Sequence, residues 1–180
     1  MMVSLRRIAL APLVAGVLVA ALAAGAAPVA VTGAFARSLF TPLAKSPELW
    51  ATVDVCNAPH HPNTIGIRGS MPSDGHPRDA MYIRFLVQSL DATTKQWADL
   101  GKSADSGFVP IGSAASTRQA GRTFEFKPTP SAYTLRGQVE FQWRRNGRAV
   151  HLVSVPTTAG HKSLAGAEPK GFSAAACVLP

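Results

Sequence analysis

The chain has 180 residues, which is enough for one ordinary domain and a short extension. It carries 18 Lys and Arg against 10 Asp and Glu, a formal net charge of +8. The basic residues are scattered, which argues against a specific nucleic-acid-binding surface and is explained by solubility. Only Arg144, Arg145 and Arg148 approach a basic patch, so they are candidates for contact with an acidic surface such as a cell-wall polymer.

The N-terminal segment, residues 1–36, has the pattern of an export signal. A short basic lead is followed by a run from Ile8 to Ala36 without a charged residue. Ala34-Phe35-Ala36 offers an A-x-A cleavage site, which favours a cleaved signal peptide. The alternative is an uncleaved helical anchor formed by residues 8–31, since about 20 apolar residues can span a bilayer. Either alternative predicts that the rest of the chain is exported.

The remaining chain is predicted to be a linker, residues 37–49, followed by an all-β domain, residues 50–180. Residues 37–49 contain two prolines and little periodicity, whereas short alternating runs separated by turn residues follow from Trp50 onward. The predicted strands are, in chain order, 51–56, 64–69, 81–90, a short strand near Trp97, 108–111, 122–127, 133–143, 148–155 and 172–179. The predicted loops are 57–63, 70–80, 114–121 and 156–171.

The strongest local prediction is a hairpin around Asn146-Gly147, the preferred pair for a two-residue type I′ turn. Apolar residues occupy the odd positions of 133–143, which predicts one buried face and one wet face. A regular register would place Trp143 opposite Val150 and Phe141 opposite Leu152. It would also place Gln142 opposite His151 with Glu140 one diagonal away, an arrangement interpreted as a solvated polar pair rather than an acid/base site.

Two cysteines bracket the predicted domain, Cys56 near its start and Cys177 near its end. In an exported chain an even pair of cysteines predicts one disulfide. The alternative is a metal site, because Cys56 is followed by His60 and His61, but zinc sites need more convergent ligands than this spacing offers.

Short strands with turn signals at this spacing favour a β-sandwich of about seven to nine antiparallel strands, with a small closed barrel as the competitor. At the level of architecture the chain resembles exported bacterial-type immunoglobulin or fibronectin-III domains. Tyr133 resembles the tyrosine-corner position of such sandwiches, where the hydroxyl bonds back to the chain. The Cys56–Cys177 pair departs from the antibody pattern, because Cys177 is on the last strand and so resembles a terminal clasp.

Few residues suggest catalysis. The sequence has no G-x-S-x-G or S-x-x-K motif, and alternation directs Glu125 and Glu140 away from the core faces of their strands. No cofactor is predicted. The best metal-binding or catalytic constellation consists of residues from two loops: His60, His61, Asp74, His76 and Asp79. A metal-dependent hydrolase using the His60, His61 and His76 loops is therefore kept as an alternative function.

Binding is the favoured class of function. Trp97, together with Trp50, falls outside the strongest core pattern and could stack on a sugar ring. His161 and Lys162 lie in the long loop 156–171, a second candidate contact surface. The sequence predicts an exported, disulfide-clasped binding or structural module at the cell surface without catalysis. The main alternative is an accessory domain that binds carbohydrate or an anionic polymer, and another extracellular protein is a further possible partner.

Overall fold

The computed structural model describes residues 43–161 and 165–180. The predicted signal peptide or anchor, the first part of the linker and Lys162 lie outside this range. Within it the protein is all-β, as predicted, with antiparallel strands and one short 3-10 turn, η1 (Lys102–Ala104). The strands are β1 (Trp50–Ala58), β2 (His61–Met71), β3 (Ala80–Leu90), β4 (Trp97–Asp99), β5 (Val109–Ser113), β6 (Arg118–Glu125), β7 (Tyr133–Arg145), β8 (Arg148–Pro156) and β9 (Cys177–Leu179). No helix among these residues is long and apolar enough to cross a membrane.

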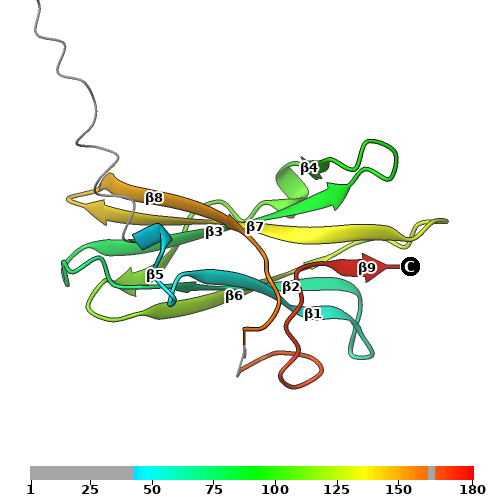
Figure 1. The fold of residues 1–180 in the computed structure, drawn as a ribbon, viewed down its shortest axis with the longest axis horizontal. Coiled ribbons are helices and arrows are strands. Elements are labelled where there is room, and N and C mark those ends of the chain that lie inside the picture. Colours follow the sequence, from blue (N-terminus) through cyan, green and yellow to red (C-terminus); the bar gives the residue numbers. More distant parts are fainter. Residues whose placement is uncertain (1–42, 162–164) are drawn as a thin grey trace, which may run out of the picture. The chain divides into compact units, whose positions relative to one another are not determined.

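The strands form two sheets, which lie in two layers in Figure 1. The first sheet has the order β1-β2-β6. The second has β3 and β7 at its centre, with β4 and β5 on the free side of β3, and β8 and β9 on the free side of β7. The predicted central position of the strand near 81–90 is confirmed, because β3 has paired strands on both sides.

One hydrophobic core lies between the two sheets. Its largest side chains come from alternate positions of the central strands, as the period-two pattern predicted, and include Met81 and Ile83 of β3 and Phe141 and Trp143 of β7, all 0% exposed. Gly69 of β2 marks a close approach of the sheets, since a Cβ there would lie 2.7 Å from Ile83 Cδ1. The core therefore leaves little room for added volume at this point.

The N-terminal boundary of the packed domain lies before Trp50. Leu49 is buried in the core and Leu43 packs against it, although both residues fall in the predicted linker 37–49. Two turns, closed by hydrogen bonds from Ser46 N to Leu43 O and from Leu49 N to Ser46 O, hold this segment. Apolar spacing in a short turn segment gives no periodic signal, which explains why the sequence pattern did not reveal the packing.

The predicted loop 57–63 is wrong. β1 and β2 extend through most of this segment, and Ala58 of β1 pairs with His61 of β2. Only the two residues between them form the connecting turn. Asn57 and Asn63 adopt positive φ angles of 44° and 52°, and Asn57 Oδ1 accepts a hydrogen bond of 2.8 Å from Asn63 N. The asparagines thus permit an irregular hairpin where the two prolines suggested a longer loop.

The β7–β8 hairpin has the predicted turn but not the predicted register. Asn146 and Gly147 have φ angles of 50° and 78°, and Arg145 pairs with Arg148. A bulge then shifts β8 by one residue, so that Trp143 faces His151 and Phe141 faces Val153. The predicted pairs of Trp143 with Val150 and of Phe141 with Leu152 are therefore wrong.

The same bulge changes which side chains of β8 face the core. His151 packs edge-on against the buried Trp143, with ring centroids 6.1 Å apart, and so lies on the core side of the hairpin. Glu140 is on the opposite face, bonded to Arg84. The predicted neighbours Glu140 and His151 are thus separated by the sheet, and Leu152 is 49% exposed instead of buried.

The predicted disulfide between Cys56 and Cys177 is present, with a Cα–Cα distance of 5.4 Å. Because Cys56 is in β1 and Cys177 is in β9, the bond joins the two sheets. The predicted last strand, 172–179, is reduced to β9, and the residues before it lie along the edge of β1. Val53 and Ala174 exchange backbone hydrogen bonds of 2.9 and 3.0 Å, and Glu168 N donates to Asp54 O. This segment covers backbone groups that an edge strand would otherwise expose.

The strand near 122–127 is also displaced from its prediction. β6 begins at Arg118, within the predicted loop 114–121, and ends at Glu125. Phe124 is buried, whereas Phe126 lies beyond the strand and packs edge-on against Tyr133, with ring centroids 6.3 Å apart. Pairing with the long strand β2 determines the length of β6, and the exposed Arg118–Gly121 part lacks the apolar alternation that would have predicted it.

Candidate functional site

The solvent side of the six-stranded sheet, called here the outer face, carries planar polar and aromatic side chains. They occupy alternate positions of the two central strands, opposite the core residues, and are half-buried against one another. The members are Tyr82, Arg84, Leu86 and Gln88 of β3, and Arg136, Gln138, Glu140, Gln142 and Arg144 of β7. Cross-strand pairing sets their order, so neighbouring side chains on this face are fixed by the register.

Arg136 lies flat on Trp97 at one end of the outer face. Its guanidinium carbon is 4.4 Å from the centroid of the Trp97 indole ring, and Nε donates a hydrogen bond of 2.8 Å to Gln88 Oε1. Burial lowers the pKa of Arg136. The sequence-nominated Trp97 therefore supports an arginine, and the ring and Gln88 together restrict the orientation of that guanidinium.

Arg144 has an equivalent environment at the other end of β7. Its guanidinium carbon is 3.8 Å from the Tyr82 ring centroid and 5.5 Å from that of Phe108, and Nε donates to Gln142 Oε1. Among the described residues, neither Arg136 nor Arg144 has a carboxylate within ion-pair distance. Both cations therefore keep N–H donors for a ligand.

Between these two arginines lies an ion-pair network centred on Arg84. It bonds both oxygens of Asp105, at 2.9 and 2.6 Å, and Glu140 Oε2 at 3.0 Å. These hydrogen bonds raise the pKa of Arg84 and lower that of Asp105. Asp99 accepts a hydrogen bond of 2.8 Å from Gln88, and Lys102 lines the same pocket as Arg84, Asp99 and Asp105. On this side of the sheet three arginines and Lys102 are therefore accompanied by three carboxylates.

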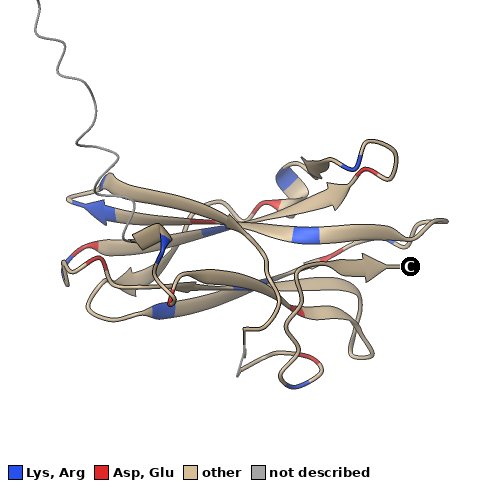
Figure 2. Cartoon of the chain, viewed as in Figure 1, with Lys and Arg blue, Asp and Glu red and all other residues tan. Residues whose placement is uncertain are grey.

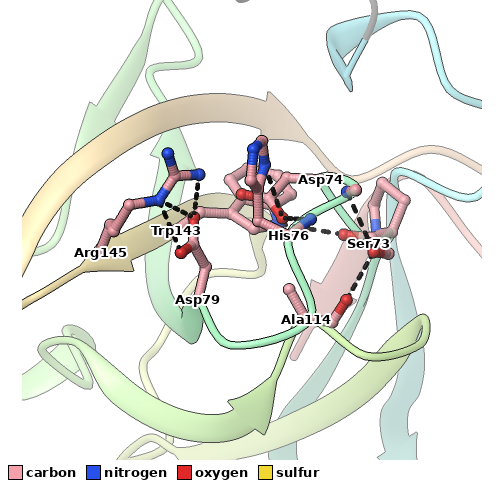
Figure 3. Close-up of polar contacts among 9 residues, drawn as sticks. Ser73, Asp74, His76, Asp79, Ala114, Trp143 and Arg145 are labelled. Carbon is pink, nitrogen blue, oxygen red and sulfur yellow. Dashed lines mark hydrogen bonds and ion pairs between the residues drawn. The ribbon is translucent and has the colours of Figure 1, made fainter.

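A second cluster is formed by the loop from Pro72 to Asp79, between β2 and β3 (Figure 3). Trp143 Nε1 donates to Pro72 O at 3.0 Å, and Ser73 Oγ donates to Ala114 O at 2.5 Å. His76 N donates to Asp74 Oδ1 at 2.9 Å, an Asx turn within the loop. The loop is thus attached to the core and to the segment after β5.

Asp74, His76 and Asp79 come together in this loop, and each offers a ligand atom within 4.8 Å of the other two. The Asp74 and Asp79 side chains are 0% and 3% exposed, whereas that of His76 is 57% exposed. Arg145 of β7 bonds both Asp79 oxygens, with contacts of 2.8 to 3.2 Å, and these bonds lower the pKa of Asp79. Burial raises the pKa of Asp74. A surface cavity of about 450 Å³ is lined in part by His76, Asp79 and Arg145, whereas Asp74 does not line it.

The structure separates the three histidines of the predicted metal-dependent hydrolase. His60 lies in the turn before β2, His61 is the first residue of that strand, and His76 follows its other end. Ten residue steps of about 3.3 Å place the two ends of β2 roughly 33 Å apart. His61 instead lies 3.4 Å from Glu168 through Nε2 and Oε2. Asp74 and Asp79, two of the acidic residues nominated from the sequence, lie close to His76, and His60 and His61 do not.

The remaining nominated binding residues do not form one surface. His161 stacks on Trp50 with ring centroids 4.8 Å apart, and burial lowers its pKa. Arg148 is exposed at the hairpin tip, while Arg144 and Arg145 point to opposite sides of β7. Figure 2 shows the basic residues scattered over strands and loops, as the sequence indicated.

Sequence reasoning missed Arg136, Tyr82 and the Arg145–Asp79 pair. Arg136 and Tyr82 were placed correctly on the face opposite the core residues, and that shared face was the available signal. The partner of Arg145 had no signal, because Asp79 lies 66 residues away and reaches it only through the pairing of β3 with β7.

Comparisons with known proteins give no family. No protein family matches the chain, and no curated protein sequence matches it. Among solved structures, one described as "putative beta-galactosidase from bacteroides fragilis" is similar at 12% identity and a TM-score of 0.33. The match covers 66% of this chain and 17% of that chain.

Proposed function

We propose that residues 43–180 form an extracytoplasmic immunoglobulin/fibronectin-III-like β-sandwich that binds an extended polysaccharide chain on the outer face, without catalysis. The strand order supports the fold: β3, β7 and β8 are neighbours in one sheet and β1, β2 and β6 in the other. This division matches that of strands C, F and G from A, B and E in immunoglobulin-type sandwiches. The disulfide and the export-type N-terminal sequence support an oxidising location.

The observation that carries the proposal is the pair of preoriented guanidinium groups, Arg136 on Trp97 and Arg144 on Tyr82. Eight residue steps of β7 separate them, which is about 27 Å at 3.4 Å per residue. One small ligand cannot reach both positions, whereas an extended chain of several sugar rings can. Guanidinium donors held by an aromatic ring and a glutamine lose little conformational freedom when they bind hydroxyl or carboxylate oxygens.

The charge of the outer face favours a polysaccharide over a strongly anionic polymer. Asp105 and Glu140 neutralise Arg84, so Arg136 and Arg144 are separated cations and do not form the continuous basic surface that would attract dense negative charge. The glutamines between the arginines add donors and acceptors that suit sugar hydroxyl groups. Sugars with few carboxylates, or none, therefore fit this surface best.

The test is affinity electrophoresis of the oxidised full chain through gels that contain hydroxyethylcellulose, polygalacturonate or polyphosphate. The proposal predicts retardation by at least one of the two polysaccharides, and retention of most of that binding at about 0.5 M NaCl, where exposed charges are screened. Retardation by polyphosphate alone, abolished by salt, would contradict the proposal. Absence of binding to all three polymers would contradict it as well.

A further inference from the structure

The loop Pro72–Asp79 brings together three side chains of types that ligate metal ions. Asp74, His76 and Asp79 each direct one ligand atom to within 4.8 Å of the other two. The carboxylates come from the buried side of the loop and the imidazole from its exposed side. The cavity of about 450 Å³ lined by His76 and Asp79 leaves room for water molecules on the solvent side.

A second observation points to a ligand at this cluster. Asp74 Oδ2 is buried and accepts no hydrogen bond from a donor group of the described residues. Its neighbour, the Asp79 carboxyl, can share a hydrogen bond with Asp74 only when one of the two carries a proton. The Asp74 side chain is 0% exposed, and its other oxygen, Oδ1, accepts from His76 N. A buried carboxylate oxygen without a donor is unfavourable, so native proteins normally supply a partner.

The charge balance indicates what kind of partner is needed. Two buried carboxylates, Asp74 and Asp79, face a single guanidinium, that of Arg145. Arg145 donates one hydrogen bond to Asp79 Oδ1 and two to Asp79 Oδ2. A carboxylate has about four lone-pair positions, so Oδ1 retains acceptor capacity. Arg145 also fixes the orientation of Asp79, as outer partners of metal ligands commonly do.

We propose that Asp74, His76 and Asp79 bind one divalent transition-metal ion of the zinc class. One imidazole and two carboxylates form a ligand set that zinc accepts, whereas calcium and magnesium select oxygen ligands alone. The ion supplies the positive partner that Asp74 Oδ2 lacks. This site is independent of the proposed polysaccharide-binding face.

Isothermal titration of the oxidised full chain with ZnCl₂ tests the site. Wild type is compared with Asp74→Asn, His76→Ala and His60→Ala. His60 is the matched control, because it is also an exposed loop histidine but lies at the other end of β2. We expect one Zn²⁺ per chain and at least about tenfold weaker binding in the first two variants, by analogy with losses of 10- to 100-fold seen around metal sites. His60→Ala should bind like wild type.

Two further readouts keep the proposal falsifiable if Asp74→Asn folds poorly. Zn²⁺ should raise the melting temperature of wild type and of His60→Ala but not of His76→Ala, whose exposed side chain leaves folding intact. Co²⁺ should give a ligand-field absorption band that His76→Ala abolishes. Failure to bind stoichiometric Zn²⁺, equal binding by all variants, or saturation by Ca²⁺ in preference to Zn²⁺ would overturn the proposal.

Discussion

Removal of the Cys56–Cys177 disulfide should destabilise the protein more than any single core substitution, apart from those that truncate a large side chain. The bond closes a loop between cysteines that are 121 positions apart in the sequence. In the chain-entropy treatment, releasing a loop of this length increases the entropy of the unfolded chain by an amount worth about 5 kcal/mol at 25 °C. Most domains of this size are stable by only about 5–15 kcal/mol, so Cys56→Ala/Cys177→Ala should unfold at much lower denaturant concentration.

Urea denaturation, followed by the fluorescence of the buried Trp143, measures this effect. Wild type with and without dithiothreitol is compared with the double variant under the same two conditions. We expect a loss of about 3–5 kcal/mol in the variant and in reduced wild type, and a steeper dependence on urea, because an uncrosslinked chain exposes more surface on unfolding. Dithiothreitol should not change the variant. A loss below about 1 kcal/mol would refute the reasoning that the bond acts by joining the two sheets through a long loop.

Two further predictions concern stability. Gly69→Ala should lower the free energy of unfolding by about 1–3 kcal/mol, because the added Cβ would lie 2.7 Å from Ile83 Cδ1. The control is Gly121→Ala, whose added Cβ would have its nearest contact at 3.4 Å and which should change the free energy of unfolding by less than about 1 kcal/mol. Equal effects of the two substitutions in thermal denaturation would contradict this packing. Asp105→Asn should lower the free energy of unfolding by about 1–2 kcal/mol at pH 7, discounted for partial exposure of the pair with Arg84. Folding lowers the pKa of Asp105 below 3.8, so the stabilisation is present above pH 3.8 and is lost as the pH falls further. The free energies of unfolding of wild type and Asp105→Asn should therefore converge in acid. A constant difference between them down to about pH 2 would exclude the ion pair as the cause of the stabilisation.

The sequence predicted the regular part of the fold because that part depends on local alternation. β3 and β7 alternate between core and solvent over their whole length, and their buried residues were identified correctly. The turn at Asn146-Gly147 was also correct, since positive φ at both positions has a clear residue preference. The register beyond it failed at the bulge, because packing of His151 against Trp143 is a tertiary contact without a local signal.

The C-terminal segment shows a different limit. Residues 165–176 were assigned partly to a loop and partly to a strand, and they are irregular, with two isolated bridges to β1 at Glu168 and Ala174. Their conformation depends on pairing with a strand more than 100 residues earlier and on the disulfide at Cys177, which only the cysteine count could suggest. Backbone pairing of this kind needs no alternation of side chains, so it leaves no pattern in the sequence.

The candidate sites were predicted in part for the same reasons. The loop containing Asp74, His76 and Asp79 was recognised by its residue types. It was wrongly grouped with His60 and His61, because the two segments are close along the chain. β2 is long enough to separate loops that are neighbours in sequence. On the outer face, Trp97 was recognised because aromatic residues outside the core pattern are noticeable, whereas its arginine partner became visible only through the β3–β7 register.

The most direct test of the proposed function compares two pairs of arginines with equal charge. Arg136→Gln/Arg144→Gln removes both guanidinium groups of the outer face, and Arg118→Gln/Arg122→Gln removes two from β6 in the other sheet. Affinity for the polysaccharide that retards wild type is measured after urea denaturation confirms that both variants fold. The outer-face variant should bind at least tenfold more weakly, a change of about 1.4 kcal/mol, and the β6 variant should bind within twofold of wild type. Equal weakening of both variants, or wild-type affinity in the outer-face variant, would contradict binding through Arg136 and Arg144.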